Sequence, residues 1–141
     1  MLAVQDALDM RDDKVFKSAS GLSGGVGLMG NVCGAILGAG MMLGTYYGRE
    51  RDELDNFEKL TNSNQMVGKL YKWFEKEFGS TTCRELRIGF SGGIHYELEI
   101  PWQFELAEKD GQFEKCADLI GRTAARTSEI MWDAIEAEKR K

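Results

Sequence analysis

The stretch GGVGLMGNVCGAILGAGMMLGTYYG, residues 24–48, determines how the chain is organised. It contains nine glycines, one cysteine (Cys33) and no charged residue. Glycine costs roughly 1 kcal/mol per position against alanine inside a helix, so this density requires a compensating interaction. Glycines recur at helical spacing at positions 30, 34 and 38 and again at 40, 44 and 48, and residues four apart share one helix face. The stretch therefore predicts a central helix with a nearly bare stripe, which a backbone or a compact inorganic ligand approaches closely.

Two other interpretations of this stretch remain open. A tightly packed core helix would use Cys33 only as a small apolar filler. A membrane span is the second, because residues 18–48 carry no charge and about 20 apolar residues suffice to cross a bilayer. The high glycine content makes transfer into lipid unfavourable, and the mixed charges at 49–52 give no positive flank. We expect a soluble, buried helix and no membrane span.

Length, charge and cysteine count narrow the class of protein. A chain of 141 residues is expected to form a single helical redox-type domain over residues 1–141. The net charge of −5 argues against nucleic-acid binding, which uses a basic face. Residues 1–13 show no signal-peptide pattern, and three cysteines, an odd number, argue against a disulfide framework. We therefore expect a cytoplasmic protein.

The rest of the chain predicts an all-α fold, a compact helical bundle around the glycine-rich helix. Helices are expected at 2–10, 11–19, 50–78, about 81–86 and 112–141. The polar run TNSN at 61–64 is the candidate break in the longest of them. Residues 89–111 are the exception, because apolar and polar residues alternate from Ile94 to Ile100. A short irregular or strand-like excursion is expected there, either packed over the core or presenting its aromatic residues as a contact surface.

All three cysteines fall in predicted helices. Cys83 follows two N-cap candidates, Ser80 and Thr81, and Cys116 lies near the start of the last helix. Free N–H groups and the helix dipole at such positions favour a thiolate, which can bind a cation or a cluster. No CxxC motif is present, so a metal site requires the fold to gather the cysteines. A lone histidine such as His95 is more typical of a surface residue than of a ligand.

Several motifs together resemble one family. They are GGVG at 24–27, CGAxxGA at 33–39, FGSxxCREL at 78–86 and a lone Cys116, and they resemble the C_GCAxxG_C_C family of redox-active proteins over residues 2–135. The resemblance implies an all-helical domain whose cysteines gather around an iron–sulfur cluster or another redox metal centre. The family pattern has a further cysteine that would fall just before Met1. We therefore expect either that Met1 is an internal methionine or that one ligand is replaced by His95, water or a partner residue.

The leading prediction is a small electron-transfer protein that holds a [2Fe–2S] or [4Fe–4S] cluster through Cys33, Cys83 and Cys116. Gly34 and Gly38 would let the backbone approach the cluster and donate N–H groups to its sulfurs. A metal-free thiol–disulfide protein is one alternative, and a non-catalytic helical interaction subunit is the other. We also expect a redox partner protein, and self-association or membership of a larger complex. The sequence does not decide whether the protein is an enzyme.

Overall fold

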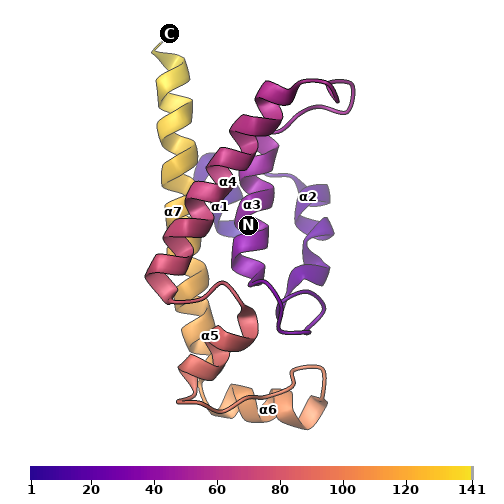
Figure 1. The fold of residues 1–141 in the computed structure, drawn as a ribbon, viewed down its shortest axis with the longest axis vertical. Helices are drawn as coiled ribbons and strands as arrows, with labels where there is room; N and C mark the ends of the chain where they lie inside the picture. The colour runs from indigo at the N-terminus through magenta and orange to yellow at the C-terminus, as the bar shows by residue number, and fades with distance from the viewer. Residues whose placement is uncertain (141) are drawn as a thin grey trace.

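The computed structural model describes residues 1–140, which form seven α-helices and one short 3-10 helix (Figure 1). No β-strand occurs among them, and the predicted all-α fold is confirmed. One isolated antiparallel bridge joins Val32 and Thr82. The elements in chain order are α1 (Leu2–Leu8), α2 (Asp13–Ser18), η1 (Ser20–Leu22), α3 (Gly34–Tyr47), α4 (Phe57–Phe78), α5 (Cys83–Phe90), α6 (Pro101–Lys109) and α7 (Gln112–Lys139).

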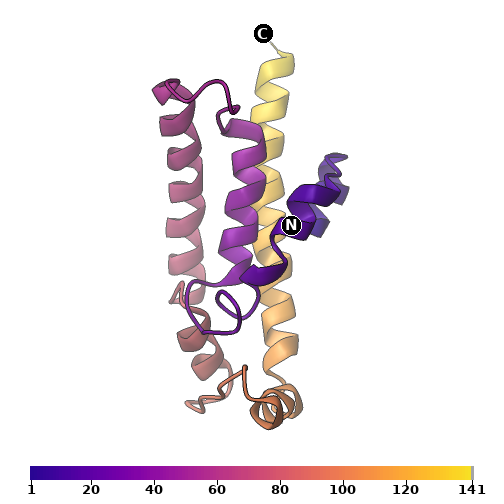
Figure 2. The same cartoon turned by 90° about the vertical axis from the view of Figure 1, so that its right-hand side faces the viewer.

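Three long helices form the body of the molecule. Helix α3 packs against α4 and α7, with α4 running antiparallel to the other two (Figures 1 and 2). Helix α1 packs on α7, while α5 and α6 lie at the lower end of the bundle, where α4 ends and α7 begins. The beginning of α3 lies at this same end. The chain therefore brings together the starts of α3, α5 and α7, which are far apart in sequence.

The core consists of two apolar clusters. The larger one joins α1, α3, α4 and α7, and its fully buried members include Val4, Leu43, Leu70 and Met131. The smaller cluster lies around the start of α3 and contains Cys33, Ile36, Phe74, Leu86 and Leu119. Among the described helices, none combines the length and the apolar character that a membrane crossing requires.

The predicted central helix is shorter than the sequence pattern indicated. Helix α3 begins only at Gly34, and residues 24–31 form a loop. Five consecutive residues, Gly24 to Leu28, have positive φ angles, and Val26 at φ 65 is among them. Glycine adopts this left-handed region without steric cost, so the glycines at the start of the stretch favour a loop over a helix. The spacing of Gly30 from Gly34 matches a helix only by coincidence.

Two further segments differ from expectation. Helix α4 begins at Phe57, where the side chain of Asn56 caps the N–H of Lys59 at 3.1 Å, and it runs unbroken through the polar residues 61–64. An irregular or strand-like excursion was expected after α5. Residues 91–100 form an irregular loop there and not a strand. The helix α6 that follows was not predicted. Pro101 opens it at the first helical position, where the missing N–H of proline costs no hydrogen bond.

Candidate functional site

Backbone hydrogen bonds join the segment before α3 to the segment before α5. The N–H of Cys33 donates to the carbonyl of Thr81 at 2.8 Å, and the N–H of Cys83 donates to the carbonyl of Asn31 at 2.7 Å. These two bonds flank the bridge between Val32 and Thr82. Cys33 is the N-cap residue of α3 and Cys83 is the first residue of α5. Because of this pairing, α3 and α5 begin next to each other, and each has a cysteine at its N-terminus.

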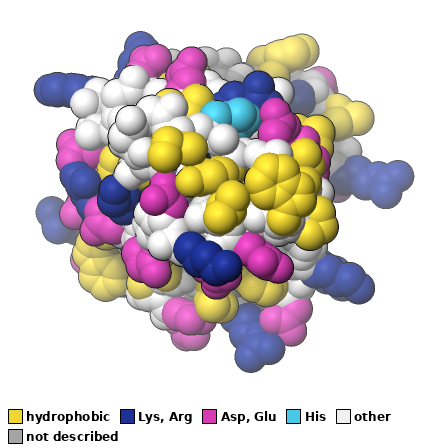
Figure 3. All heavy atoms as spheres, turned by 90° about the horizontal axis from the view of Figure 1, so that it is seen from below, with side chains coloured by type: hydrophobic (Ala, Val, Ile, Leu, Met, Phe, Trp, Pro, Cys, Tyr) yellow, Lys and Arg dark blue, Asp and Glu magenta, His cyan; other side chains and the backbone are white. Residues whose placement is uncertain are grey.

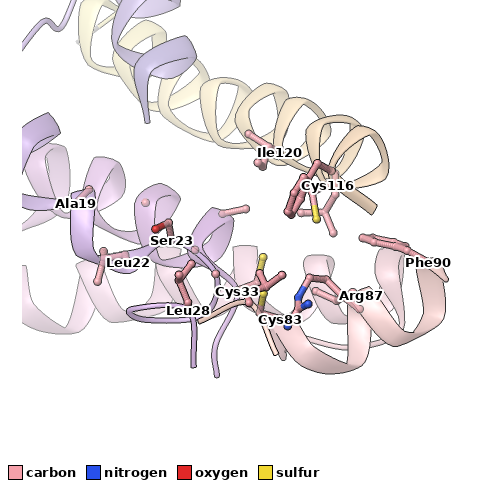
Figure 4. Close-up of a pocket in the computed structure, with 18 of the residues that line it drawn as sticks. Ala19, Leu22, Ser23, Leu28, Cys33, Cys83, Arg87, Phe90, Cys116 and Ile120 are labelled. Atoms are coloured by element: carbon pink, nitrogen blue, oxygen red, sulfur yellow. The ribbon is translucent and has the colours of Figure 1, made fainter. Parts of the chain in front are cut away.

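The two cysteines project to the same side of this pairing. Each lies one residue beyond the bridge, and side chains alternate between the two faces of an extended backbone. Their sulfur atoms lie next to each other at one wall of a cavity, while Cys116 of α7 points toward them from the other side (Figure 4). The structure thus brings all three cysteines from the sequence prediction to one place.

The glycine-rich loop holds Cys33 in position through close backbone contacts. At Gly25, which has a φ of 78°, a Cβ atom would lie 2.5 Å from the backbone nitrogen of Asn31. At Gly30, which has a φ of 74°, a Cβ atom would lie 3.1 Å from the Cβ of Arg84. The carbonyl of Gly30 also accepts a hydrogen bond from the N–H of Arg84 at 3.0 Å. Glycine at these positions lets the loop fold back on itself and approach α5.

The cavity between the cysteines has a volume of about 500 Å³. Gly34 and Gly38, predicted to face a cofactor, both line it, together with Cys33, Cys83 and Cys116. Most of the other lining side chains are apolar: Leu22, Leu28, Leu86, Phe90, Leu98, Phe104, Phe113, Leu119 and Ile120. The titratable side chains in the lining are the three thiols and the guanidinium of Arg87. The surface that surrounds the sulfur atoms is therefore mostly apolar.

Burial raises the pKa of two of the three thiols, those of Cys33 and Cys116. Cys33 and Cys83 are buried, and Cys116 is partly buried. Burial raises the pKa of the Cys33 thiol, although the N–H groups of Ala35 and Ile36 act in the opposite direction. Burial also raises the pKa of the Cys116 thiol to about 11, with smaller contributions from the charges of Cys83 and Cys33. At Cys116 the apolar surroundings therefore outweigh the helix start that was expected to favour a thiolate.

The cysteines are not arranged around a single metal ion. Within residues 1–140, no group of three or more cysteine, histidine or carboxylate side chains is close enough to hold one ion. His95 does not line the cavity, and its Nε2 lies 3.3 Å from the carboxylate of Glu97. The three thiols instead line a shared cavity.

Arg87 is the cavity residue that the sequence did not single out. It lies on α5 one turn after Cys83 and is only 2% exposed. An arginine in a short amphipathic helix ordinarily lies at the surface, so the pattern gave no signal for its burial.

The expected contact surface lies at the lower end of the bundle. Figure 3 shows hydrophobic side chains exposed on this end. Trp102 is 61% exposed and Phe104 is 38% exposed. Binding of a partner protein to this surface stays a prediction.

Comparison with known protein families matches residues 1–130 to the family described as "Putative redox-active protein (C_GCAxxG_C_C)". Neither the comparison with curated proteins nor the comparison with solved structures found a match.

Proposed function

Because the chain belongs to the C_GCAxxG_C_C family of redox-active proteins, we propose that it is an electron-transfer protein whose cysteines hold an iron–sulfur cluster. The observation that carries this proposal is the meeting of Cys33, Cys83 and Cys116 at one apolar cavity. They come from three different helices and are separated by 50 and 33 positions in the sequence, counted as 83 − 33 and 116 − 83. A fold that needed its cysteines only as small apolar fillers would have no reason to gather them.

The residues present fit such a group in three respects. The cavity offers three thiols, room of about 500 Å³ and a wall without carboxylates. Arg87 also lines the cavity, and its positive charge suits an iron–sulfur cluster, which is anionic when thiolates ligate it. The first N–H groups of a helix lack partners within the helix, so Gly34 at the start of α3 offers a donor to a sulfur atom. Gly38, one turn later, leaves the cavity wall open.

In this proposal the protein supplies ligands, shielding and tuning. When bound, an iron–sulfur cluster supplies one-electron transfer, with a potential that depends on hydrogen bonds to sulfur and on burial. Cys33 and Cys83 bind from one wall and Cys116 from the other, each losing its proton on binding. The apolar lining excludes water from the thiolates. Three cysteines leave one position for a further ligand, which solvent, a partner protein or a residue joined to Met1 supplies. Met1 itself lines the cavity.

A metal-free thiol–disulfide protein is the second candidate, and the adjacency of Cys33 and Cys83 favours it (Figure 4). Oxidation would form one S–S bond between these two sulfurs and release two protons and two electrons. A disulfide in a partner protein would accept the electrons and become a dithiol. Cys116 has no part in that chemistry, and this is the difference that separates the two candidates.

The test is anaerobic reconstitution of the full chain with iron and sulfide, followed by a visible absorption spectrum and iron and sulfide counts. The cluster proposal expects a coloured protein with matched iron and sulfide, and loss of both in C116S. The variant I120V is the matched control, because Ile120 lines the same cavity without offering a ligand. Colourless protein that instead forms a Cys33–Cys83 disulfide, detected by mass spectrometry, would refute the cluster and support the second candidate.

A further inference from the structure

Helix α6 presents an apolar face to solvent. The helix packs against α7, and Ala107 is the one buried residue among its nine. The ring of Phe104 lies on the ring of Phe113 of α7, with 4.8 Å between the ring centroids. Trp102 is 61% exposed and Leu106 is 40% exposed. These two residues are four positions apart and therefore share one side of the helix, which we call the α6 face.

The segment that contains the α6 face is strongly acidic. Residues 91–111 contain one basic residue, Lys109, and five acidic ones: Glu97, Glu99, Glu105, Glu108 and Asp110. The segment therefore carries a charge of −4, whereas the whole chain carries −5. The rest of the chain holds 18 of the 23 acidic residues and 17 of the 18 basic ones, so it is nearly neutral. Figure 3 shows acidic side chains beside the exposed hydrophobic ones at this end of the molecule.

The acidic side chains of α6 are not neutralised by neighbouring cations. Among residues 1–140, every ion pair that involves lysine or arginine lies outside the segment 91–111. Within the segment, Glu97 lies 3.3 Å from Nε2 of His95. Glu105 and Glu108 are exposed and belong to none of these pairs. Such a charge imbalance attracts a binding partner of opposite charge.

Helix α6 also forms part of the wall of the cysteine cavity. Phe104 and Phe113 line the cavity, and so does Leu98 of the loop that precedes α6. Phe104 is at the same time 38% exposed, so its ring reaches both the cavity and the outer surface. A protein that docks on α6 would therefore lie roughly 10 Å, one helix diameter, from the cavity.

We propose that the α6 face is the docking site of a basic redox protein. An apolar patch of that partner would cover Trp102 and Leu106, and its lysine or arginine side chains would meet Glu105 and Glu108. Opposite charges speed the encounter of two proteins, and a buried aromatic side chain at the centre of a contact supplies much of the binding energy. The inference rests on the proposed function, because an electron-transfer protein requires a partner close to its redox centre.

A second copy of this chain fits the α6 face less well than a basic partner does. A contact between two α6 faces would bring together two segments that each carry a charge of −4. Like charges that face each other across an interface are strongly unfavourable. The charge of the segment therefore favours a basic protein as the occupant.

The experiment is a calorimetric titration of the full chain, reduced and metal-free, with cytochrome c, a basic haem protein. Ferrous cytochrome c is used so that the thiols stay reduced, at ionic strengths of about 10 mM and about 300 mM. Cytochrome c with succinylated lysines, which carry reversed charge, is the control probe. The variants are W102A and E105Q/E108Q.

Each variant has a matched control at another place in the fold. W132A removes a tryptophan of α7 that is 52% exposed. E58Q/E75Q removes two exposed carboxylates of α4 and so changes the net charge by the same amount as E105Q/E108Q. All the substituted side chains are exposed, so circular dichroism should show wild-type helix content in each variant.

We expect the wild type to bind cytochrome c at low ionic strength and to lose at least about tenfold in affinity at high ionic strength, because salt screens the charges. W102A should weaken binding by about tenfold, since a few large side chains carry most of the binding energy of an interface. E105Q/E108Q should weaken it by about three- to tenfold, and both control variants should stay within about twofold of the wild type. The succinylated probe should not bind.

Three results would overturn the proposal. The first is the absence of binding at low ionic strength. The second is equal binding by W102A and W132A, because attraction would then depend on charge without a docking face. The third is a dimer of the chain alone that light scattering detects and W102A abolishes, because the face would then belong to a second copy.

The two proposals fail separately. A wild-type chain that takes up no iron on reconstitution would refute the cluster. The titrations use metal-free protein, so they would still decide the role of the α6 face.

Discussion

Replacing Gly34 with alanine tests how the cavity wall is built. Gly34 is the first residue of α3, and an added Cβ would lie 2.7 Å from the carbonyl oxygen of Leu22. It would also lie 3.4 Å from the carbonyl carbon of Leu22 and 3.6 Å from the Cα of Ser23. All three atoms belong to the backbone, so no side chain can rotate away and the η1 segment must shift. Leu22 and Ser23 line the cysteine cavity, and this shift would deform it.

The expected magnitude combines two opposing effects. Overpacking of this kind costs about 1–3 kcal/mol. Alanine regains roughly 1 kcal/mol of helix propensity, so we expect G34A to lower the free energy of unfolding by up to about 2 kcal/mol. The matched control is G44A on the same helix, because a Cβ at Gly44 meets nothing within 4 Å. That variant should gain up to about 1 kcal/mol.

Urea denaturation followed by circular dichroism measures both variants against the wild type. The reasoning predicts opposite signs for G34A and G44A, together with reduced iron uptake only in G34A. It would be refuted if G34A were as stable as G44A, because the contact with Leu22 would then not limit the packing of η1 on α3.

Three further predictions follow from burial and binding. The Cys116 thiol keeps its proton to about pH 11 in the folded state, so the unfolded state binds fewer protons above pH 9 and stability falls as the pH rises. Urea titrations at pH 8 and pH 11 should show that this fall is about 2 kcal/mol smaller in C116A, and an equal fall would contradict the raised pKa. Removal of iron from reconstituted protein with a chelator should lower the Tm, because a ligand that binds only the folded state stabilises it; an unchanged Tm would show that the metal is not bound at a folded site. Phe74 is fully buried, so F74A should cost about 3–5 kcal/mol in urea denaturation, whereas F57A, at a side chain that is 68% exposed, should stay within about 0.5 kcal/mol; similar losses would contradict the assigned core.

The helices that the sequence predicted well are those with a regular apolar period. Helix α4 buries Leu70 and Phe74 at a spacing of four residues, and it ends at Phe78, the last residue of the range that the sequence predicted. Its unbroken passage through residues 61–64 was not predicted, because polar residues weaken a helix less than packing on α3 supports it.

The segments that the sequence did not predict lack such a period. Glycine serves a helix stripe and a left-handed loop equally well, so residues 24–31 could be assigned only from their tertiary contacts with α5. The alternation from Ile94 to Ile100 suggested a strand, but an isolated segment without a partner strand has no ladder of hydrogen bonds. Helix α6 was missed as well, although Pro101 fits the first position of a helix.

The candidate site, too, was predicted from the sequence only in part. The three cysteines were predicted as one set from the family resemblance, and their spacing alone gave no proximity. The pairing of Cys33 with Cys83 depends on the bridge between Val32 and Thr82, a contact between segments 50 residues apart, counted as 82 − 32. The burial of Arg87 beside the cavity was not predicted either, because no local sequence pattern indicates it.

The central claim is that Cys33, Cys83 and Cys116 act together as the ligands of one cluster. Its most direct test is the iron and sulfide content per chain of C33S, C83S and C116S, reconstituted anaerobically beside the wild type and I120V. The account predicts matched iron and sulfide in the wild type and in I120V, with clear loss in each of the three serine variants. Wild-type iron and sulfide content in C116S would contradict it, because the adjacent pair of Cys33 and Cys83 would then suffice without the cysteine from α7.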